Sequence, residues 1–308
     1  MHGLSVRVSP PPAISPVSFS ARRRIRNKSK CRAQIPTSTI EDSRNPACHP
    51  IGCCHCGRRG LLGASLSGLL PFQPLSVSAA PPRDPTASIE MVHPSRPDFY
   101  EELYAKAMSS GMKAYEREIA GYKGKLFSNL KGTKKKVLEL GVGTGPNFKY
   151  YVGNSDLSII GVDPNKQMEK YARSSAATAG LPDSNFNFLR GVGEALPVED
   201  DSMDAVIGTL VLCSVKDVDA TLREVQRVLK PGGQYIFIEH VAAEDGTFLR
   251  FMQGILDPLQ QLVTDGCHLT RETGKQIARV GFSDISLNNA FLRSVSLFGP
   301  HVYGVACK

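Results

Sequence analysis

The stretch Val137-Leu-Glu-Leu-Gly-Val-Gly-Thr-Gly145 decides the fold class of this 308-residue chain. An apolar run typical of a buried β-strand breaks at Gly141 into three glycines at alternate positions, and a second such run, Ser158-Ile-Ile-Gly-Val-Asp163, ends on a carboxylate. In a parallel α/β sheet the carboxyl ends of neighbouring strands meet at one edge, where such sheets bind nucleotide-like ligands. The sequence therefore predicts a binding crevice in which Gly141, Gly143 and Gly145 let the backbone approach a ligand. Asp163 is expected to accept hydrogen bonds from ribose hydroxyls there.

The spacing of the glycines indicates which nucleoside the loop binds. A dinucleotide site has the pattern G-x-G-x-x-G, but here Pro146 stands where its third glycine would fall. This disfavours a NAD dehydrogenase. Glu139 would repel a pyrophosphate, whereas it suits a ligand that carries an ammonium and a sulfonium. The pattern E-x-G-x-G-x-G before a strand-end aspartate resembles motif I of the class I S-adenosylmethionine (SAM) methyltransferases, which implies SAM as cofactor.

Strand and helix patterns alternate after the loop, which predicts a parallel sheet with crossover helices. A helical pattern from 98 to 131 precedes the sheet. The later strands are expected at 186–190, 203–210 and 234–240, with helices at 164–180, 215–229, 247–264 and 271–280. Two last strands, near 283–291 and 301–307, are expected to form an antiparallel hairpin. The prediction is an α/β, Rossmann-like class I methyltransferase fold, with a seven-stranded, mostly parallel sheet and an antiparallel C-terminal strand.

The charge of the chain divides it into a leader and a body. Residues 1–80 carry 11 Lys/Arg and 2 Asp/Glu, whereas the 26 basic and 27 acidic residues of 81–308 nearly cancel. A neutral body disfavours nucleic acid as a partner and an RNA methyltransferase as the function. We expect three regions: a leader over 1–80 that is disordered or cleaved, N-terminal helices over 81–131, and a SAM-dependent methyltransferase domain over 132–308. The lysines between 123 and 136 are either solvated surface or a weak contact with anionic lipid.

The leader has the composition of an organelle transit peptide. Residues 1–40 contain eight Arg/Lys, seven Ser and no acidic residue, which favours import into a plastid. Arg58-Arg59 precede an apolar run, and the small residues at 77–80 resemble a cleavage site. This second signal resembles the twin-arginine signal for the thylakoid lumen. We therefore expect a chloroplast location, either stromal or thylakoid-associated, with the lumen as an alternative.

The leader also holds five of the eight cysteines. Cys53 and Cys56 have the C-x-x-C spacing of a zinc site, with His55 between them. A cleaved leader has no need of a structural metal, however, and the prediction is that the protein has no metal site.

The resemblance to class I methyltransferases assigns further residues to the SAM pocket. Gly193-Glu-Ala195 follows the third strand, where that family places an acidic side chain on the adenine amino group and backbone amides on the ring. Pro164, next to Asp163, and Leu210, at the end of the fourth strand, complete the expected pocket. The Asn/Asp-Pro-Pro-Tyr/Phe signature of nitrogen methyltransferases is absent after the fourth strand, which disfavours DNA adenine or protein glutamine as acceptor.

The C-terminal half resembles a narrower family. Leu210-Val-Leu-Cys-Ser-Val215, Glu239-His-Val-Ala-Ala-Glu244, Asp265-Gly-Cys-His-Leu-Thr-Arg-Glu-Thr273 and Pro300-His-Val-Tyr-Gly304 together are similar to the animal methyltransferase-like family of membrane-associated alkyl thiol S-methyltransferases. The animal enzymes begin with a hydrophobic anchor, whereas this chain begins with a plastid-type leader. The best interpretation is methyl transfer from SAM to a small apolar acceptor, an alkyl thiol. We also expect peripheral contact with a membrane. The sequence does not indicate the oligomeric state.

An alkyl thiol must react as its thiolate, so a base near the acceptor would help. His240, at the end of the fifth strand, is the first candidate. Asp265 and His268, in a loop that could fold over the pocket, are the next, although each could equally be a structural residue.

Two other functions remain open. Motif I through the fifth strand also resembles the ubiquinone/menaquinone methyltransferases, so the acceptor could be the carbon of a prenylated quinol or phenol. The chain could also bind SAM without catalysis.

Overall fold

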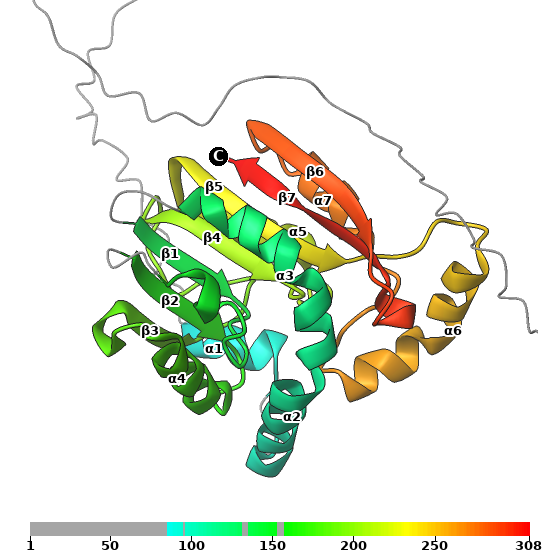
Figure 1. Cartoon of the computed structure of the whole chain (residues 1–308), viewed down its shortest axis with the longest axis horizontal. Coiled ribbons are helices and arrows are strands. Elements are labelled where there is room, and N and C mark those ends of the chain that lie inside the picture. Colours follow the sequence, from blue (N-terminus) through cyan, green and yellow to red (C-terminus); the bar gives the residue numbers. More distant parts are fainter. Residues whose placement is uncertain (1–84, 95, 131–134, 153–156) are drawn as a thin grey trace, which may run out of the picture.

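The computed structural model describes residues 85–94, 96–130, 135–152 and 157–308 (Figure 1). The predicted leader and its targeting signals lie outside these residues. Three helices come first: α1 (Pro85–Val92), α2 (Asp98–Gly111) and α3 (Lys113–Phe127). The alternating part follows as β1 (Lys135–Leu140), β2 (Leu157–Asp163), α4 (Met168–Ala179), β3 (Phe186–Arg190), β4 (Met203–Thr209), α5 (Val218–Val228) and β5 (Leu229–His240). The chain ends with α6 (Phe248–Val263), α7 (Thr273–Arg279), β6 (Asp284–Phe291) and β7 (Pro300–Cys307).

The strands form one sheet in the order β3-β2-β1-β4-β5-β7-β6. The pairs from β3 to β5 are parallel, and β7 runs antiparallel to both of its neighbours, β5 and β6. The predicted fold class, including the antiparallel C-terminal strand, is confirmed. Because β1 and β4 are neighbours while the chain moves outward from them in opposite directions, the topological switch point lies between these two strands.

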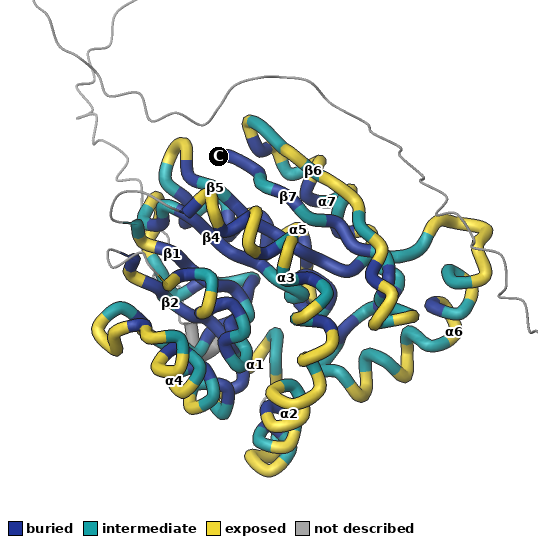
Figure 2. The backbone as a smooth tube through the Cα atoms, viewed as in Figure 1, coloured by how far each residue is buried: buried dark blue, intermediate teal, exposed yellow. Residues whose placement is uncertain are grey.

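Alternating side chains of the strands bury both faces of the sheet, as the apolar runs require. One face presents Val137, Ile159, Ile207 and Ile238 to α3 and α4. The opposite face presents Leu138, Val162, Val206 and Phe237 to α5 and α7. The result is a three-layer arrangement whose central strands are mostly buried, whereas the edge strand β6 and the helices α2 and α6 are largely exposed (Figure 2).

The element boundaries differ most from the sequence prediction at the start of β5 and at the start of α4. Strand β5 begins at Leu229 instead of 234, because Leu229 pairs with Met203 and the register with β4 shifts before Gln234 pairs with Ala205. The segment Pro231-Gly-Gly233 therefore lies within the strand as an irregularity and does not separate it from α5. Helix α4 begins at Met168, and the residues after Asp163 form a turn before it. The helix ends at Gly180, a left-handed cap with φ at 79°.

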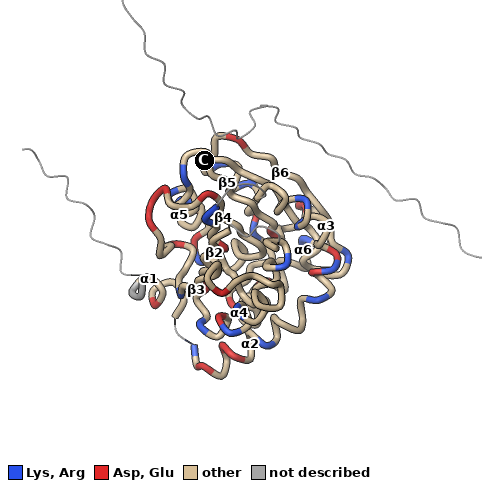
Figure 3. The backbone as a smooth tube through the Cα atoms, turned by 60° about the vertical axis from the view of Figure 1, so that its left-hand side comes forward, with Lys and Arg blue, Asp and Glu red and all other residues tan. Residues whose placement is uncertain are grey.

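The lysines between 123 and 136 that the structure describes differ in exposure; Lys131 and Lys134 lie outside the described residues. Lys123 is buried, and its Nζ lies 2.6 Å from Oε1 of Glu116. Over the described residues, basic and acidic positions are interspersed along the chain (Figure 3). Among the helices of the described part of the chain, none combines the length and the apolar character needed to cross a bilayer.

Candidate active site

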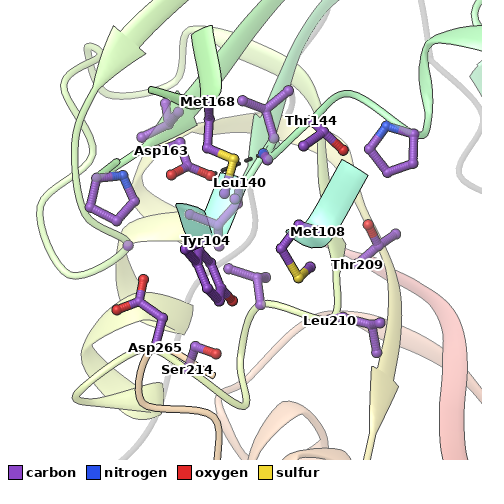
Figure 4. Close-up of a pocket in the computed structure, with 18 of the residues that line it drawn as sticks. Tyr104, Met108, Leu140, Thr144, Asp163, Met168, Thr209, Leu210, Ser214 and Asp265 are labelled. Atoms are coloured by element: carbon purple, nitrogen blue, oxygen red, sulfur yellow. Dashed lines mark hydrogen bonds between the residues drawn. The ribbon is translucent and has the colours of Figure 1, made fainter. Parts of the chain in front are cut away.

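A cavity of about 790 Å³ opens at the switch point of the sheet. The carboxyl ends of β1, β2 and β4 form its floor, and residues from α1, α2 and α3 also line it (Figure 4). It therefore lies where the order of the strands predicts a ligand crevice. Of the predicted site residues, nine line this cavity: Gly141, Gly143, Asp163, Pro164, Gly193, Glu194, Leu210, Asp265 and His268. Glu139, Gly145, Ala195 and His240 are not among its lining residues.

The glycine loop leaves β1 in a conformation that favours glycine. Gly141, Gly143 and Gly145 have φ values of 62°, 52° and 76°. A Cβ at Gly145 would meet the ring of Phe148 at 2.3 Å, whereas a Cβ at Gly143 would find its nearest atom at 3.9 Å. Gly145 therefore serves packing between the loop and the segment that follows it, while Gly141 and Gly143 face the cavity.

Asp163 connects the loop to the end of β2. Its Oδ2 accepts a hydrogen bond from the amide of Gly143 at 3.0 Å, and its Oδ1 accepts one from the amide of Asn165 at 3.0 Å. The side chain is nearly buried but lines the cavity. Burial raises the pKa of Asp163 to about 6, although both amides stabilise the carboxylate. The group is thus fixed in direction before any ligand binds.

Glu139 lies beneath the loop. Its oxygens accept hydrogen bonds from Nδ2 of Asn147 at 2.8 Å and from the hydroxyl of Tyr151 at 2.6 Å. Burial raises its pKa to about 7. These contacts fasten the end of β1 to the segment after the loop. Its predicted direct role toward SAM remains a prediction.

Gly193 and Glu194, which were predicted to meet the adenine, line the cavity, and so does Leu210 of the expected pocket. Oε1 of Glu194 accepts hydrogen bonds from the amides of Lys216 and Asp217, at the start of α5. Leu210 has a positive φ of 54°, which is rare for a residue with a branched side chain. Backbone strain of this kind is concentrated at ligand sites.

Asp265 and His268 line the cavity next to the segment after β4, where the amide of His268 donates to the carbonyl of Cys213 at 2.9 Å. Asp265 forms an ion pair with Arg96, at 3.0 Å, and its oxygens lie 3.1 Å from Nε2 of His93. Burial opposes ionisation of Asp265, but the hydrogen bond and charge of His93 outweigh it and lower the pKa. Nδ1 of His268 lies 3.4 Å from Oδ2 of Asp257 in α6. Burial and the charge of Arg271 lower the pKa of His268.

His240 is not in the cavity. It is buried, its Nε2 lies 3.1 Å from Sγ of Cys267, and its ring meets Phe298 edge-on. We expected His240 to lie beside the acceptor, but in the structure its side chain points to Cys267 and does not line the cavity. Of the three predicted catalytic residues, only Asp265 and His268 line the cavity.

Comparison with known proteins agrees with this geometry. Residues 138–237 match a family model described as a methyltransferase domain. Thiol S-methyltransferase TMT1A of Homo sapiens is 44% identical over 204 residues, which cover 63% of this chain and 81% of the relative. The chain belongs to this family of SAM-dependent methyltransferases. Thiol S-methyltransferase TMT1B of Homo sapiens is 38% identical over 200 residues, or 62% of this chain and 80% of the relative. The ubiquinone/menaquinone biosynthesis C-methyltransferase UbiE of Pasteurella multocida is 36% identical over 130 residues, 41% of this chain and 44% of the relative.

Solved structures agree on the fold. A methyltransferase seen in complex with the Trm112 activator of Haloferax volcanii has a TM-score of 0.53 and 18% identity, and the match covers 69% of this chain and 99% of that one. A SAM-dependent methyltransferase of Thermotoga maritima has a TM-score of 0.50 and 20% identity. The match covers 68% of this chain and 99% of that one. The family model and the TMT1A relative confirm the predicted enzyme class and cofactor.

The sequence reasoning missed the part of this methyltransferase site that comes from the N-terminal helices. His93, Arg96, Tyr104 and Met108 all line the cavity, and Tyr104 lies between Asp163 and Asp265 in Figure 4. Burial, followed by nearby acidic groups, raises the pKa of Tyr104, so that its hydroxyl stays protonated and can donate a hydrogen bond. No motif marks these residues. The helical pattern from 98 onward includes Tyr104 and Met108 but does not reveal the face that meets the cavity, and His93 and Arg96 lie before it, between α1 and α2.

Proposed function

We propose that the protein transfers the methyl group of SAM to an alkyl thiol. The observation that carries the proposal is the place of His268: it lines the same cavity as the glycine loop and Asp163, and Asp257 lies behind it. The identity to the TMT1 relatives, which extends over four fifths of their length, supports the same acceptor.

The chemistry needs alignment and a proton acceptor. The thiol sulfur attacks the methyl carbon in line with the sulfonium, the old carbon–sulfur bond breaks, and the products are the methyl thioether and S-adenosylhomocysteine. Holding the two partners in one dry cavity supplies much of the acceleration. His268 takes the thiol proton, since its low pKa leaves the imidazole neutral and able to accept. Tyr104 and Met108 form the wall against which an apolar acceptor is packed.

The test is methyl transfer by the full chain from labelled SAM, with an alkyl thiol and a demethylated prenylquinol offered separately. Label on the thiol is expected. His268→Gln is expected to lower kcat by at least 10²-fold, the usual contribution of a positioned base, while SAM affinity stays unchanged. Label on the quinol alone would contradict the thiol assignment and favour the chemistry that the UbiE relatives are named for. SAM binding without transfer to either would contradict both.

We propose in addition that the apolar face of α6 makes the peripheral membrane contact. Phe248, Phe251, Ile255, Leu259 and Leu262 recur at helical spacing, and all are exposed. The helix is attached instead by polar contacts: the amide of Gln253, which is buried, accepts from Ala243 N and donates to Leu297 O. A groove lined by Phe99, Tyr100, Pro258 and Leu262 shares Arg96 and Gly266 with the cavity. An apolar acceptor dissolved in a bilayer would therefore meet the protein beside its active site.

Co-sedimentation with phosphatidylcholine vesicles tests this contact. The wild type is expected to sediment, and Phe251→Glu with Leu262→Glu to remain in solution, because apolar burial drives such binding. Lys135→Glu with Lys136→Glu is the matched control and should sediment like the wild type. Equal sedimentation of both double variants, or loss only in the lysine variant, would contradict the role of α6.

The composition of residues 1–80 supports a proposal for location. We infer import into plastids, with the twin-arginine run as a second signal. A fluorescent protein fused after residue 80 should enter the stroma or associate with thylakoids, and import followed by fractionation separates these places from the lumen. Fluorescence that stays in the cytosol would contradict the proposal.

A further inference from the structure

Three buried side chains that the methyl-transfer chemistry does not use meet behind the cavity wall. They are Cys213, from the loop after β4, His240, at the end of β5, and Cys267, from the loop after α6. All three are more than nine tenths buried. Two sulfurs and an imidazole nitrogen, all within 4.8 Å of one another, form a donor set typical of zinc and other thiophilic metal ions.

The spacing of the donor atoms fits an ion with small movements. A tetrahedral zinc ion with bonds of about 2.0–2.3 Å separates its ligand atoms by roughly 3.6–3.8 Å. Nε2 of His240 and Sγ of Cys267 are 3.1 Å apart, and the widest pair is no more than 4.8 Å apart. Each pair therefore needs to change by about 1 Å or less, which rotation about the cysteine χ1 bonds can supply.

The surroundings of the cluster are polar and positively charged on one side. Nη1 of Arg271 donates to the carbonyl of Leu212, next to Cys213. Buried Glu239 accepts from the amides of Val211 and Leu212, on the other side of the same loop.

We propose that Cys213, His240 and Cys267 bind one zinc ion or a similar thiophilic divalent cation. The ion would connect three segments that are distant in the sequence. Ser214 is next to one ligand and Gly266 and His268 flank another, and all three of these neighbours line the cavity. The ion thus fixes the two loops that shape the acceptor side. Three protein ligands leave a fourth position, as in zinc sites that exchange a ligand.

Metal analysis of the full chain, purified under reducing conditions and dialysed after addition of Zn²⁺, tests the proposal without reference to methyl transfer. The wild type is expected to retain about one ion per chain at this site, and cobalt in its place to show a thiolate-to-cobalt charge-transfer band. The variants Cys213→Ser, Cys267→Ser and His240→Gln should each lose the ion and the band.

Two control variants separate this site from other ligands. Cys53→Ser with Cys56→Ser removes the C-x-x-C pair of the leader, and His301→Asn removes a buried histidine that lies beside His240 but outside the cluster. Both should keep the charge-transfer band. SAM binding by each variant shows that it is folded, so loss of metal with SAM binding retained supports the proposal.

Three results would overturn it: no cobalt band in the wild type, a band that survives all three ligand variants, or a band lost only in the leader variant. A Cys213–Cys267 disulfide in the protein purified without reductant, with no metal bound after reduction, would likewise overturn it. Methyl transfer to a thiol could still occur in each case, so failure of the metal site does not imply failure of the proposed function.

Discussion

The carboxylate of Asp163 at the end of β2 accepts a hydrogen bond from the backbone amide of Gly143, at 3.0 Å, in the loop after the neighbouring strand β1. This contact joins the two sequence features that first indicated a SAM site. It exists because β1 and β2 pair in parallel, with Leu140 opposite Val162, so that both strands end at the same height. The loop and the carboxylate therefore form one rigid unit.

Removal of this carboxylate is expected to weaken SAM binding. Asp163→Ala loses charge-assisted hydrogen bonds of about 1.5–3 kcal/mol, which corresponds to roughly 10- to 150-fold in Kd. Calorimetric titration with SAM measures the change. Asp183→Ala, at an exposed site on the loop before β3, is the control and should bind as the wild type does. An unchanged Kd in Asp163→Ala would contradict the assignment.

The affinity for SAM is also expected to fall in acid. The pKa of Asp163 in the free protein is raised to about 6, so the carboxylate is present above this pH and is protonated below it. A protonated side chain must lose its proton before it can accept from both hydroxyls of a ribose, which costs up to about tenfold in Kd per pH unit below 6. Titrations at several pH values check this. Asp163→Asn should bind SAM weakly at every pH and should not lose further affinity below pH 6. A loss of the same size in that variant would show that another group causes the pH dependence.

Alanine variants of Gly145 and Gly143 distinguish a glycine needed for packing from one that faces the ligand cavity. Both have positive φ, so alanine costs about 1–2 kcal/mol of strain at either position. At Gly145 the new methyl group would also overlap Phe148, an overpacking that adds about 1–3 kcal/mol. Gly145→Ala should therefore unfold at clearly lower denaturant concentration than Gly143→Ala. Equal loss of stability in the two variants would show that Gly145 has no special packing role.

The sequence predicts the site residues that belong to local patterns, and it fails for those that only long-range packing brings to the cavity. The mostly parallel sheet and the place of Asp163 follow from the glycine loop and from the alternation of strands and helices, because local patterns and the rules for parallel sheets determine them. His240 could not be placed in this way. Its position at the end of β5 was correct, but whether its ring points to the cavity or to Cys267 depends on the loop after α6, whose path no local pattern encodes. The same holds for Tyr104 and His93, which reach the cavity only because the N-terminal helices cover it.

The contact between His93 and Asp265 is expected to hold the N-terminal helices over bound SAM in a pH-dependent way. His93 faces Asp265, Arg96 and, further off, Asp163. The hydrogen bond to Asp265 raises the pKa of His93 above the usual 6.5 of a histidine, against the effect of burial. A raised pKa means that the contact is at full strength below about 6.5 and is lost as pH rises through the raised value. The ion pair of Arg96 with Asp265 remains at high pH.

Release of labelled SAM in a chase experiment measures this effect. The dissociation rate of the wild type should rise as pH increases above neutrality, by a few-fold, since one partly exposed ion pair is lost while another remains. His93→Gln should release SAM at the faster rate at every pH and show no alkaline change, whereas Asp163→Asn should keep the alkaline change. An alkaline rise of the same size in His93→Gln would assign the effect to a different group and leave the N-terminal helices without this pH-dependent contact.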